Sequence, residues 1–212
     1  MVFNGISPSL LVSGLSGIGK SYIVRKRLEY HKKVEGQDFH IIKGKVSPMG
    51  LYRFLYEHQT ATIVFDDADS VFDTETSVNI LKSALDSYDV RRINWISERL
   101  PEDLEPQFDF GGQIIFISNM DASKLDSAVL SRTMVINLQM SRKEITGHLK
   151  NIIDVLEPKT PKKIKLEVLD FLDNISEDLD NYNIRTFIKA CRVRQHADFN
   201  KKDWKKTFMV LN

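Results

Sequence analysis

The sequence of 212 residues predicts an α/β fold, with a five-stranded parallel sheet flanked by helices and a small all-helical part at its C-terminal end. Up to about residue 140, short apolar runs alternate with segments of helical periodicity, which indicates parallel strands joined by right-handed crossovers. From Ser141 onward only helical periodicity is visible, and a glycine-rich loop joins the first apolar run to the first helical segment. We therefore expect two domains, over residues 1–140 and 141–212.

The five predicted strands are short and apolar, as is typical of a sheet covered on both faces. They span residues 10–12, 39–42, 61–65, 113–118 and 134–138. Helices are expected between them, over residues 22–33, from Pro48 onward, over 74–87 and over 123–130. The stretch 88–110 is irregular because Pro101 and Pro106 interrupt it, although Ile93 and Trp95 indicate a short strand.

Four helices are predicted in the C-terminal part, over about 142–156, 162–175, 184–197 and 202–210. Ser141 and Glu144 have the spacing of a capping box, which marks the start of the first of these helices. Lysine and arginine outnumber acidic residues from about residue 181 onward, so this end of the chain is locally basic. A basic helix face is usually solvated, so it does not by itself identify a partner.

The composition excludes several classes of protein. Lysine and arginine number 30 against 29 acidic residues, so the net charge does not predict a polyanionic partner. The single cysteine, Cys191, rules out an intramolecular disulfide framework, and the histidines lack the spacing of a zinc site. Apolar runs stay well below the roughly 18 residues of a membrane span, and the N-terminus lacks a leader pattern. We expect a cytoplasmic protein without a membrane partner.

The glycine-rich loop fits the phosphate-binding pattern G-x-x-x-x-G-K-S/T at every constrained position. Its glycines let successive backbone N–H groups point at phosphate oxygens, and the N-terminus of the following helix favours negative charge. Lys20 is expected to reach the β- and γ-phosphates, and the Ser21 hydroxyl to bind Mg²⁺. Tyr22 stands where a dinucleotide-binding turn has its third glycine, which disfavours that fold. The candidate nucleotide-binding residues are Gly14, Ser16, Gly17, Ile18, Gly19, Lys20, Ser21 and Tyr22.

Further polar residues stand at the ends of predicted strands, before the last strand, or at the start of a helix. These residues are Asp66, Asp67, Asn119, Arg132 and Arg185. With the phosphate-binding loop, they make the chain resemble the AAA+ P-loop ATPases over nearly its whole length, and more narrowly the clamp loaders and helicase loaders of phages or mobile elements. The resemblance implies bound ATP and Mg²⁺, and a homo-oligomeric ring or open spiral that binds ATP between subunits.

The resemblance also implies roles for the residues at the strand ends. Asp66 would share Mg²⁺ with Ser21 by ordering the water shell of the ion. Asp67 would polarise the attacking water, and Asn119, in the place of the sensor 1 residue, would hold that water in line with the γ-phosphate. Asp67 departs from the family, whose second acid is usually glutamate. One alternative is therefore that Asp67 only caps the following turn, with Asp69 as a substitute.

Two arginines are implied to act at the γ-phosphate, one by stabilising the charge of the transition state and one as a sensor. Arg132 resembles the arginine finger of clamp loaders, which reaches the nucleotide of a neighbouring subunit. Arg185 resembles the sensor 2 residue, which reports loss of the γ-phosphate by moving the lid. Arg91 and Arg92 compete with Arg132 for the role in trans, and an ordinary surface position is the alternative for Arg132 and Arg185.

Two features connect the chain with nucleic acid. Lys43 and Lys45 lie in the loop where ring ATPases place contacts of their central channel, and lysines suit phosphates, although a solvated basic turn is the alternative. Trp95 and Phe108 lie in what resembles an insertion that some DNA-handling members use, although packing against the core is the commoner role of such aromatics. We expect an ATP-hydrolysing motor that acts on DNA or on a DNA-bound replication or recombination protein. The alternatives are an ATP-dependent protein remodeller or chaperone, and a nucleotide-dependent scaffold with little hydrolysis.

Overall fold

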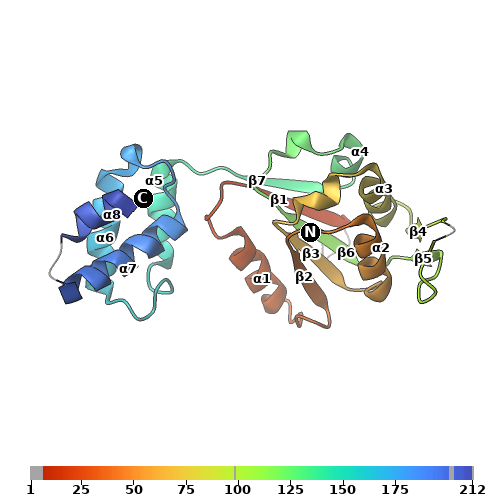
Figure 1. Cartoon of the computed structure of the whole chain (residues 1–212), viewed down its shortest axis with the longest axis horizontal. Coiled ribbons are helices and arrows are strands. Elements are labelled where there is room, and N and C mark those ends of the chain that lie inside the picture. Colours follow the sequence, from red (N-terminus) through yellow and green to blue (C-terminus); the bar gives the residue numbers. More distant parts are fainter. Residues whose placement is uncertain (1–6, 98, 201–202, 212) are drawn as a thin grey trace. The chain divides into compact units, whose positions relative to one another are not determined.

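The computed structural model of the chain describes residues 7–97, 99–200 and 203–211. The chain forms two compact units, whose elements are labelled in Figure 1. The first unit contains the residues up to Gly14 together with Lys20–Leu138. The second contains Leu15–Gly19 and the residues from Gln139 onward, so the tip of the glycine-rich loop groups with the C-terminal helices.

The first unit is built on a five-stranded parallel sheet, which confirms the prediction (Figure 1). Its strands are β1 Ser9–Gly14, β2 Phe39–Lys43, β3 Thr62–Asp66, β6 Gln113–Ile117 and β7 Met134–Leu138, in the spatial order β2-β3-β6-β1-β7. Strand β3 is buried along its whole length between β2 and β6. Because the strands are parallel, their carboxyl ends meet at one edge, where ligands bind in open α/β sheets. The glycine-rich loop, Asp66 and Asn119 all emerge at that edge.

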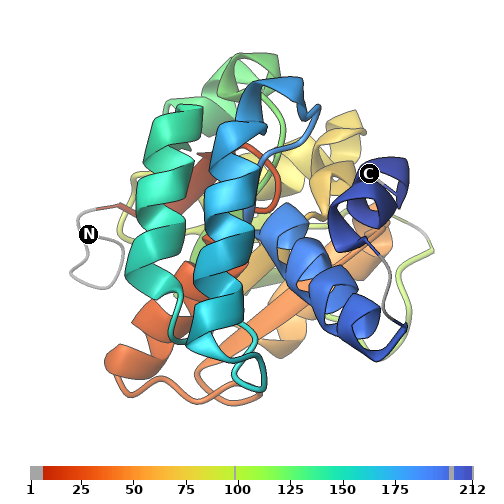
Figure 2. The same ribbon diagram turned by 90° about the vertical axis from the view of Figure 1, so that its left-hand side faces the viewer.

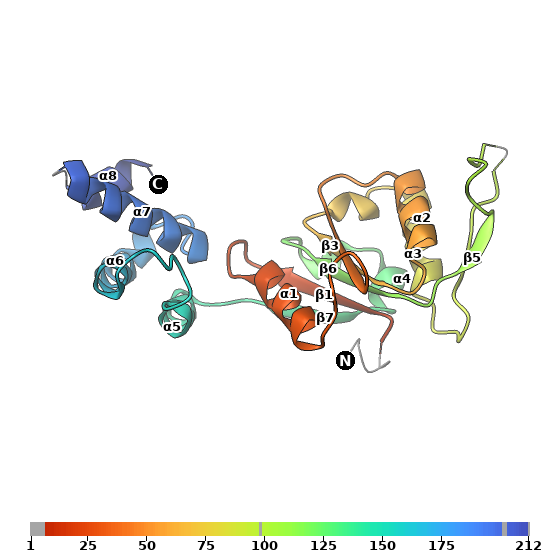
Figure 3. The same ribbon diagram turned by 90° about the horizontal axis from the view of Figure 1, so that it is seen from below.

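Helices cover both faces of the sheet. They are α1 Lys20–Tyr30, α2 Pro48–Glu57, α3 Glu75–Ala84 and α4 Ser127–Leu130, with the 3₁₀ turns η2 Asp69–Phe72 and η3 Ala122–Lys124. The alternation of side chains along β3 explains the two layers. Phe65 belongs to an apolar cluster with residues of α2 and α3, whereas Val64 belongs to a second cluster with residues of α1. In Figure 3, α2 and α3 lie next to each other and away from α1.

Two of these helices are shorter than predicted because side chains cap them. Helix α3 begins after Thr74, whose Oγ1 accepts the Ser77 N–H, and it ends at Ala84. The predicted helix over 123–130 is split into η3 and α4. The Asp126 carboxylate caps α4 by accepting the Ala128 N–H at 2.9 Å, so the backbone before it stays extended.

A two-stranded antiparallel hairpin, β4 Arg92–Asn94 with β5 Gln107–Asp109, lies in the irregular stretch. Strand β4 agrees with the short strand expected around Ile93, although Trp95 lies just beyond it. The sequence does not predict β5, because three residues are too few to show strand alternation. The rings of Trp95 and Phe108 lie 5.5 and 5.2 Å from that of Tyr52, between centroids. Both aromatics therefore pack against the core.

The second unit contains a helical bundle, as predicted. Its helices are α5 Arg142–Ile152, α6 Lys162–Asn174, α7 Ile184–Asn200 and α8 Trp204–Leu211, with the 3₁₀ turn η4 Ser176–Asp178. Figure 2 shows them from blue-green to dark blue, with α5 and α6 side by side. The buried core of the bundle includes Leu149, Val168, Leu172, Phe187 and Phe208.

Local side chains set the boundaries of these helices as well. The predicted capping box is present, since the Ser141 side chain accepts the Glu144 N–H and the Glu144 carboxylate accepts the Ser141 N–H at 2.7 Å. Helix α7 continues past the predicted end at 197 to Asn200. Residue 202, where the last helix is predicted to begin, lies outside the described residues.

Cys191 is a packing residue of this bundle, and burial raises the pKa of its thiol to about 12. Within the described ranges, every helix is too short or too polar to cross a membrane.

Candidate nucleotide-binding site

The loop between β1 and α1 takes a conformation that favours glycine. Gly14, Gly17 and Gly19 have φ angles of +134°, +74° and +93°. At Gly14 a Cβ atom would stand 2.1 Å from the carbonyl oxygen of Leu138. The loop thus leaves β1 in close contact with β7, and α1 begins immediately after it at Lys20.

Lys20 is buried, with 6% of its surface exposed. Its Nζ donates hydrogen bonds to the carbonyl oxygen of Gly14 at 2.8 Å and to Oδ1 of Asn119 at 2.7 Å. Lysine is almost never buried without such partners. Two residues that the sequence singles out in separate segments, on the phosphate-binding loop and after β6, are therefore in direct contact.

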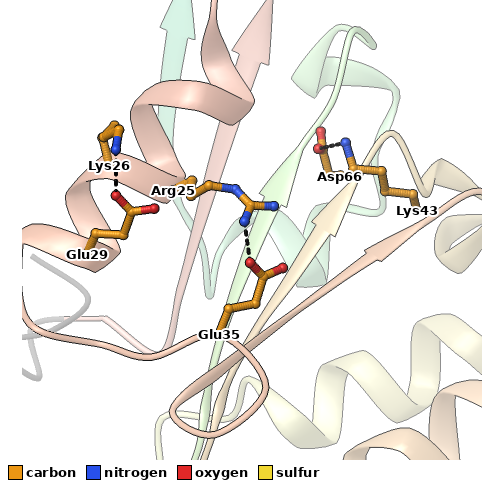
Figure 4. Close-up of polar contacts among 6 residues, drawn as sticks. All are labelled: Arg25, Lys26, Glu29, Glu35, Lys43 and Asp66. Atoms are coloured by element: carbon orange, nitrogen blue, oxygen red, sulfur yellow. Dashed lines mark hydrogen bonds and ion pairs between the residues drawn. The ribbon is translucent and has the colours of Figure 1, made fainter.

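Asp66 is the most buried acidic group of the site, with 2% of its surface exposed. Its Oδ1 accepts a hydrogen bond from the Ser21 hydroxyl at 2.7 Å. Its Oδ2 lies 2.7 Å from Nζ of Lys43, the last residue of β2 (Figure 4). Lys43, predicted as a nucleic-acid contact, thus lies against the predicted magnesium residue. Among the described residues, ion pairs are found for Lys43 and not for Lys45.

Asn119 connects Lys20 with Asp67. While its Oδ1 accepts from Lys20, its Nδ2 donates to Oδ1 of Asp67 at 2.9 Å. This amide orientation suits both partners, since an ammonium group only donates and a carboxylate only accepts. Asp67 has a φ of +53°, and its N–H donates to the carbonyl oxygen of Ile117 at 3.0 Å. A left-handed backbone is uncommon outside glycine, asparagine and aspartate, so the turn after β3 holds Asp67 in a selected position.

Asp69 belongs to the same acidic stretch, at the start of η2. Burial raises the pKa of its carboxyl group, and the nearby charges of Asp67 and Asp73 add to this effect. A hydrogen bond with Ser118 and the charge of Lys20 act in the opposite direction. Ser118 thus contacts this acidic stretch. It is not among the residues predicted from the sequence, although its position between β6 and Asn119 points to it.

The tip of the loop contacts the start of α7 within the second unit. The Ile184 N–H donates to the carbonyl oxygen of Gly17 at 3.0 Å, and Nη1 of Arg185 donates to the Ser16 hydroxyl at 3.2 Å. A Cβ atom at Gly17 would stand 2.8 Å from Cγ of Asn183. The structure therefore brings together Ser16 and Arg185, two predicted site residues far apart in the sequence.

Two other candidate nucleotide-binding residues, Ile18 and Tyr22, differ in their surroundings. Ile18 is buried, with 4% of its surface exposed, so it anchors the loop. Tyr22 projects from α1 with 58% exposed, and the Lys26 ammonium lies 5.9 Å from the centroid of its ring.

Arg132 folds back on α4. Its Nη1 donates to the carbonyl oxygen of Ala128 at 2.9 Å, while its Nε is buried without a hydrogen-bond partner. Its backbone carbonyl accepts from the Ser9 hydroxyl, which ties the segment to β1. The guanidinium thus stabilises the C-terminal end of a short helix in the single chain.

The two competing arginines lie on the hairpin side of the core. Both terminal nitrogens of Arg91 donate to backbone carbonyls, those of Ala84 and Gly112, and burial lowers the pKa of its guanidinium. Arg92 is exposed and forms a two-pronged ion pair with Asp109 across the hairpin. Arg91 therefore links two backbone segments of the core, whereas Arg92 lies at the surface.

The donor set fits magnesium with a nucleotide. Ser21 and Asp66 offer a hydroxyl and a carboxylate within 2.7 Å of each other, and Mg²⁺ prefers oxygen ligands while keeping several waters. Across the described part of the chain, histidine, cysteine, aspartate and glutamate do not gather in groups of three with metal-ligand geometry. A site made of these two groups would leave the other positions around the ion to waters and substrate phosphates.

Comparison with known proteins gives one sequence relative and a set of similar structures. A scan against models of protein families finds no match. The "uncharacterized 36.7 kDa protein in nrdC-mobD intergenic region" of Enterobacteria phage T4 is 32% identical over 168 residues. The match covers 72% of this chain and 51% of that protein, so the chain spans about half the length of its relative.

Two of the similar solved structures are of RuvB. The Thermotoga maritima RuvB Holliday junction branch migration motor has a TM-score of 0.59 and a sequence identity of 17%. An arginine-to-alanine variant of the same protein has a TM-score of 0.59 and an identity of 16%. In both cases the alignment covers 99% of this chain and 64% of the solved chain. The chain therefore has the P-loop NTPase fold of RuvB, with a helical C-terminal part.

Proposed function

We propose that this chain is an AAA+ ATPase, with residues 1–140 as its ATPase core and 141–212 as its lid. It binds ATP and Mg²⁺ on the glycine-rich loop and hydrolyses ATP to ADP and phosphate. The observation that carries this proposal is the connected set of contacts from Lys20 through Asn119 to Asp67. This set joins a phosphate-binding cation to a carboxylate at the sheet edge where such folds bind ligands.

The binding step needs little rearrangement of the core. Two uncharged acceptors, the Gly14 carbonyl oxygen and the Asn119 amide oxygen, contact Lys20, and exchanging one of them for a phosphate oxygen gives a stronger, charge-assisted hydrogen bond. Ser21 and Asp66 would hold Mg²⁺, the first directly and the second through the water shell of the ion. Bound magnesium supplies positive charge to the β- and γ-phosphates.

Asp67 and Asn119 act in the chemical step. The oxygen of a water attacks the γ-phosphorus, the bond to the β–γ bridging oxygen breaks, and ADP leaves with that electron pair. The Asp67 carboxylate takes the proton of the attacking water, and Asn119 sets the position of that carboxylate relative to Lys20. Arg185, which contacts Ser16 on the loop tip, acts as the sensor of the γ-phosphate.

We further propose that the protein acts as a homo-oligomeric ring or spiral on DNA or on a DNA-bound replication or recombination protein. The fold of a protein named as a Holliday junction branch migration motor supports this proposal. A phage relative supports a viral or mobile-element setting. Arg132 remains our proposed finger in trans, which requires it to exchange Ala128 for the nucleotide of a neighbour, and Arg92 is the surface alternative.

The test is steady-state ATP hydrolysis by the purified protein at low salt, alone and with single-stranded, double-stranded or four-way junction DNA. We expect turnover that depends on Lys20 and rises with at least one form of DNA. Turnover that is unaffected by every DNA would instead favour a protein remodeller. ATP binding with background turnover in all conditions would favour the scaffold, for which the short side chain of Asp67 is the structural reason.

A further inference from the structure

We infer that Lys43 is a tethered counter-cation of Asp66 that competes with magnesium, so that it reduces the dependence of nucleotide binding on Mg²⁺. The inference rests on the proposed nucleotide site. Lys43, which the sequence predicts as a nucleic-acid contact, is on this inference a positioning residue of the ATP site.

The backbone places Lys43 beside Asp66. Strands β2 and β3 are parallel neighbours, and in their register Lys43 is the partner of Asp66. The Nζ–Oδ2 distance is 2.7 Å, and the other carboxylate oxygen, Oδ1, is held by Ser21 at the same distance. Both oxygens of Asp66 therefore contact side chains of the chain itself, and Figure 4 shows the contact with Lys43.

The two partners differ sharply in burial. The Asp66 side chain is 3% exposed, whereas the Lys43 side chain is 66% exposed. A buried carboxylate needs a compensating partner, while an exposed lysine retains the freedom to leave. The ion pairs Arg25–Glu35 and Lys26–Glu29 in Figure 4 are exposed on both sides, so neither shows this asymmetry.

This asymmetry predicts competition between two cations for one carboxylate. Without metal, Lys43 neutralises Asp66, so the triphosphate does not meet an uncompensated negative charge. With a metal ion bound at Ser21, the ion neutralises the Asp66 carboxylate in place of Lys43. Repulsion between the ion and the Lys43 ammonium then disfavours the ion pair of Lys43 with Asp66. Removing Lys43 should therefore weaken nucleotide binding without Mg²⁺ and strengthen the response to Mg²⁺.

The experiment is a measurement of the dissociation constant of a fluorescent ADP analogue in EDTA and across a Mg²⁺ titration. For Lys43→Gln we expect the constant in EDTA to rise, and the half-maximal Mg²⁺ concentration to fall, each by about three- to tenfold, the size expected of a half-exposed ion pair. Lys43→Arg should restore the wild-type values. Lys45→Gln, which removes the same charge two residues beyond Lys43, should leave both values unchanged.

The possible results separate this inference from the proposed function. Equal behaviour of Lys43→Gln, Lys45→Gln and the wild type toward Mg²⁺ would overturn the inference alone. Equal losses of DNA affinity in both glutamine variants, with an unchanged magnesium response, would overturn it in favour of a nucleic-acid contact. If the wild type does not bind the nucleotide in either condition, the proposed function fails, and this inference fails with it.

Discussion

The candidate site has two halves that differ in burial. The binding half consists of Lys20, Ser21 and Asp66, and its two charged members have 6% and 2% of their surfaces exposed. The reaction half consists of Asp67 and Asn119, which are exposed and share one hydrogen bond of 2.9 Å. The core thus fixes the groups that we propose to hold phosphate and metal, whereas the groups that we propose to act on water lie at the surface of the chain.

The sharpest way to separate the two halves is Asp67→Asn. Asparagine tolerates the left-handed backbone at this position, so the change removes the carboxylate without adding backbone strain. We expect turnover to fall by about 10²- to 10⁴-fold, the usual contribution of a general base, while ATP affinity stays within about threefold. Steady-state kinetics and equilibrium binding check this together. A parallel loss of affinity would mean that Asp67 belongs to the binding half.

Gly14→Ala tests how tightly β1, which leads to the binding half, packs against β7. The new Cβ would meet the Leu138 carbonyl and also adopt a positive φ, so we expect a loss of about 3 kcal/mol or more in the free energy of unfolding. Gly36→Ala is the matched control, because Gly36 has a φ of +84° with open space around its Cβ position. It should cost only about 1 kcal/mol. Similar losses in urea unfolding of both variants would show that the contact between β1 and β7 is not tight.

A smaller effect is expected of Arg185→Ala. This change removes the contact with Ser16, and we expect the apparent ATP affinity to fall about tenfold while ADP affinity changes little, because only ATP has a γ-phosphate. Arg192→Ala is the control, since Arg192 lies on the same helix and pairs with Glu157. Equal losses of affinity for ATP and ADP would show that Arg185 supports the loop through Ser16 and does not sense the γ-phosphate.

The smallest effect concerns the pH dependence of stability. Burial is the main cause of the raised pKa of Asp69 in the folded chain. The folded state therefore keeps a proton that the unfolded state has already lost, and stability declines as the pH rises through the folded pKa. We expect Asp69→Asn to raise the thermal midpoint at pH 7 and to lose this advantage in acid, below the ordinary carboxyl range. A difference that stays constant across the pH series would contradict this account.

The sequence predicts the sheet well, and it singles out the residues of the binding half, because the signals for both are local. The apolar strands, the glycine spacing around Lys20 and the acid that ends β3 can each be read within a few residues. The pairing of Lys43 with Asp66 requires the register of two strands, which no local pattern contains. Ser118 was missed for a similar reason, since its contact with Asp69 crosses from one strand end to the next.

The arginines show another limit of the sequence. The sequence shows Arg91, Arg92 and Arg132 as the same residue type, and only the structure shows that they differ in burial. Arg91 is committed to two backbone carbonyls, while Arg92 is paired at the surface of the hairpin. The predicted strand near Ile93 was correct, whereas β5 was too short to detect, so the sequence did not reveal the hairpin that holds Arg92.

The most direct test of the central claim is ATP binding and turnover by Lys20→Ala, with Lys26→Ala as the control on the same helix. Lys20 is buried against Gly14 and Asn119, whereas Lys26 forms an exposed pair with Glu29. The account predicts that Lys20→Ala lowers ATP affinity and turnover by at least about 100-fold, equivalent to about 2.7 kcal/mol, while Lys26→Ala matches the wild type. Equal ATP binding by both variants would contradict the assignment of this loop as the nucleotide site.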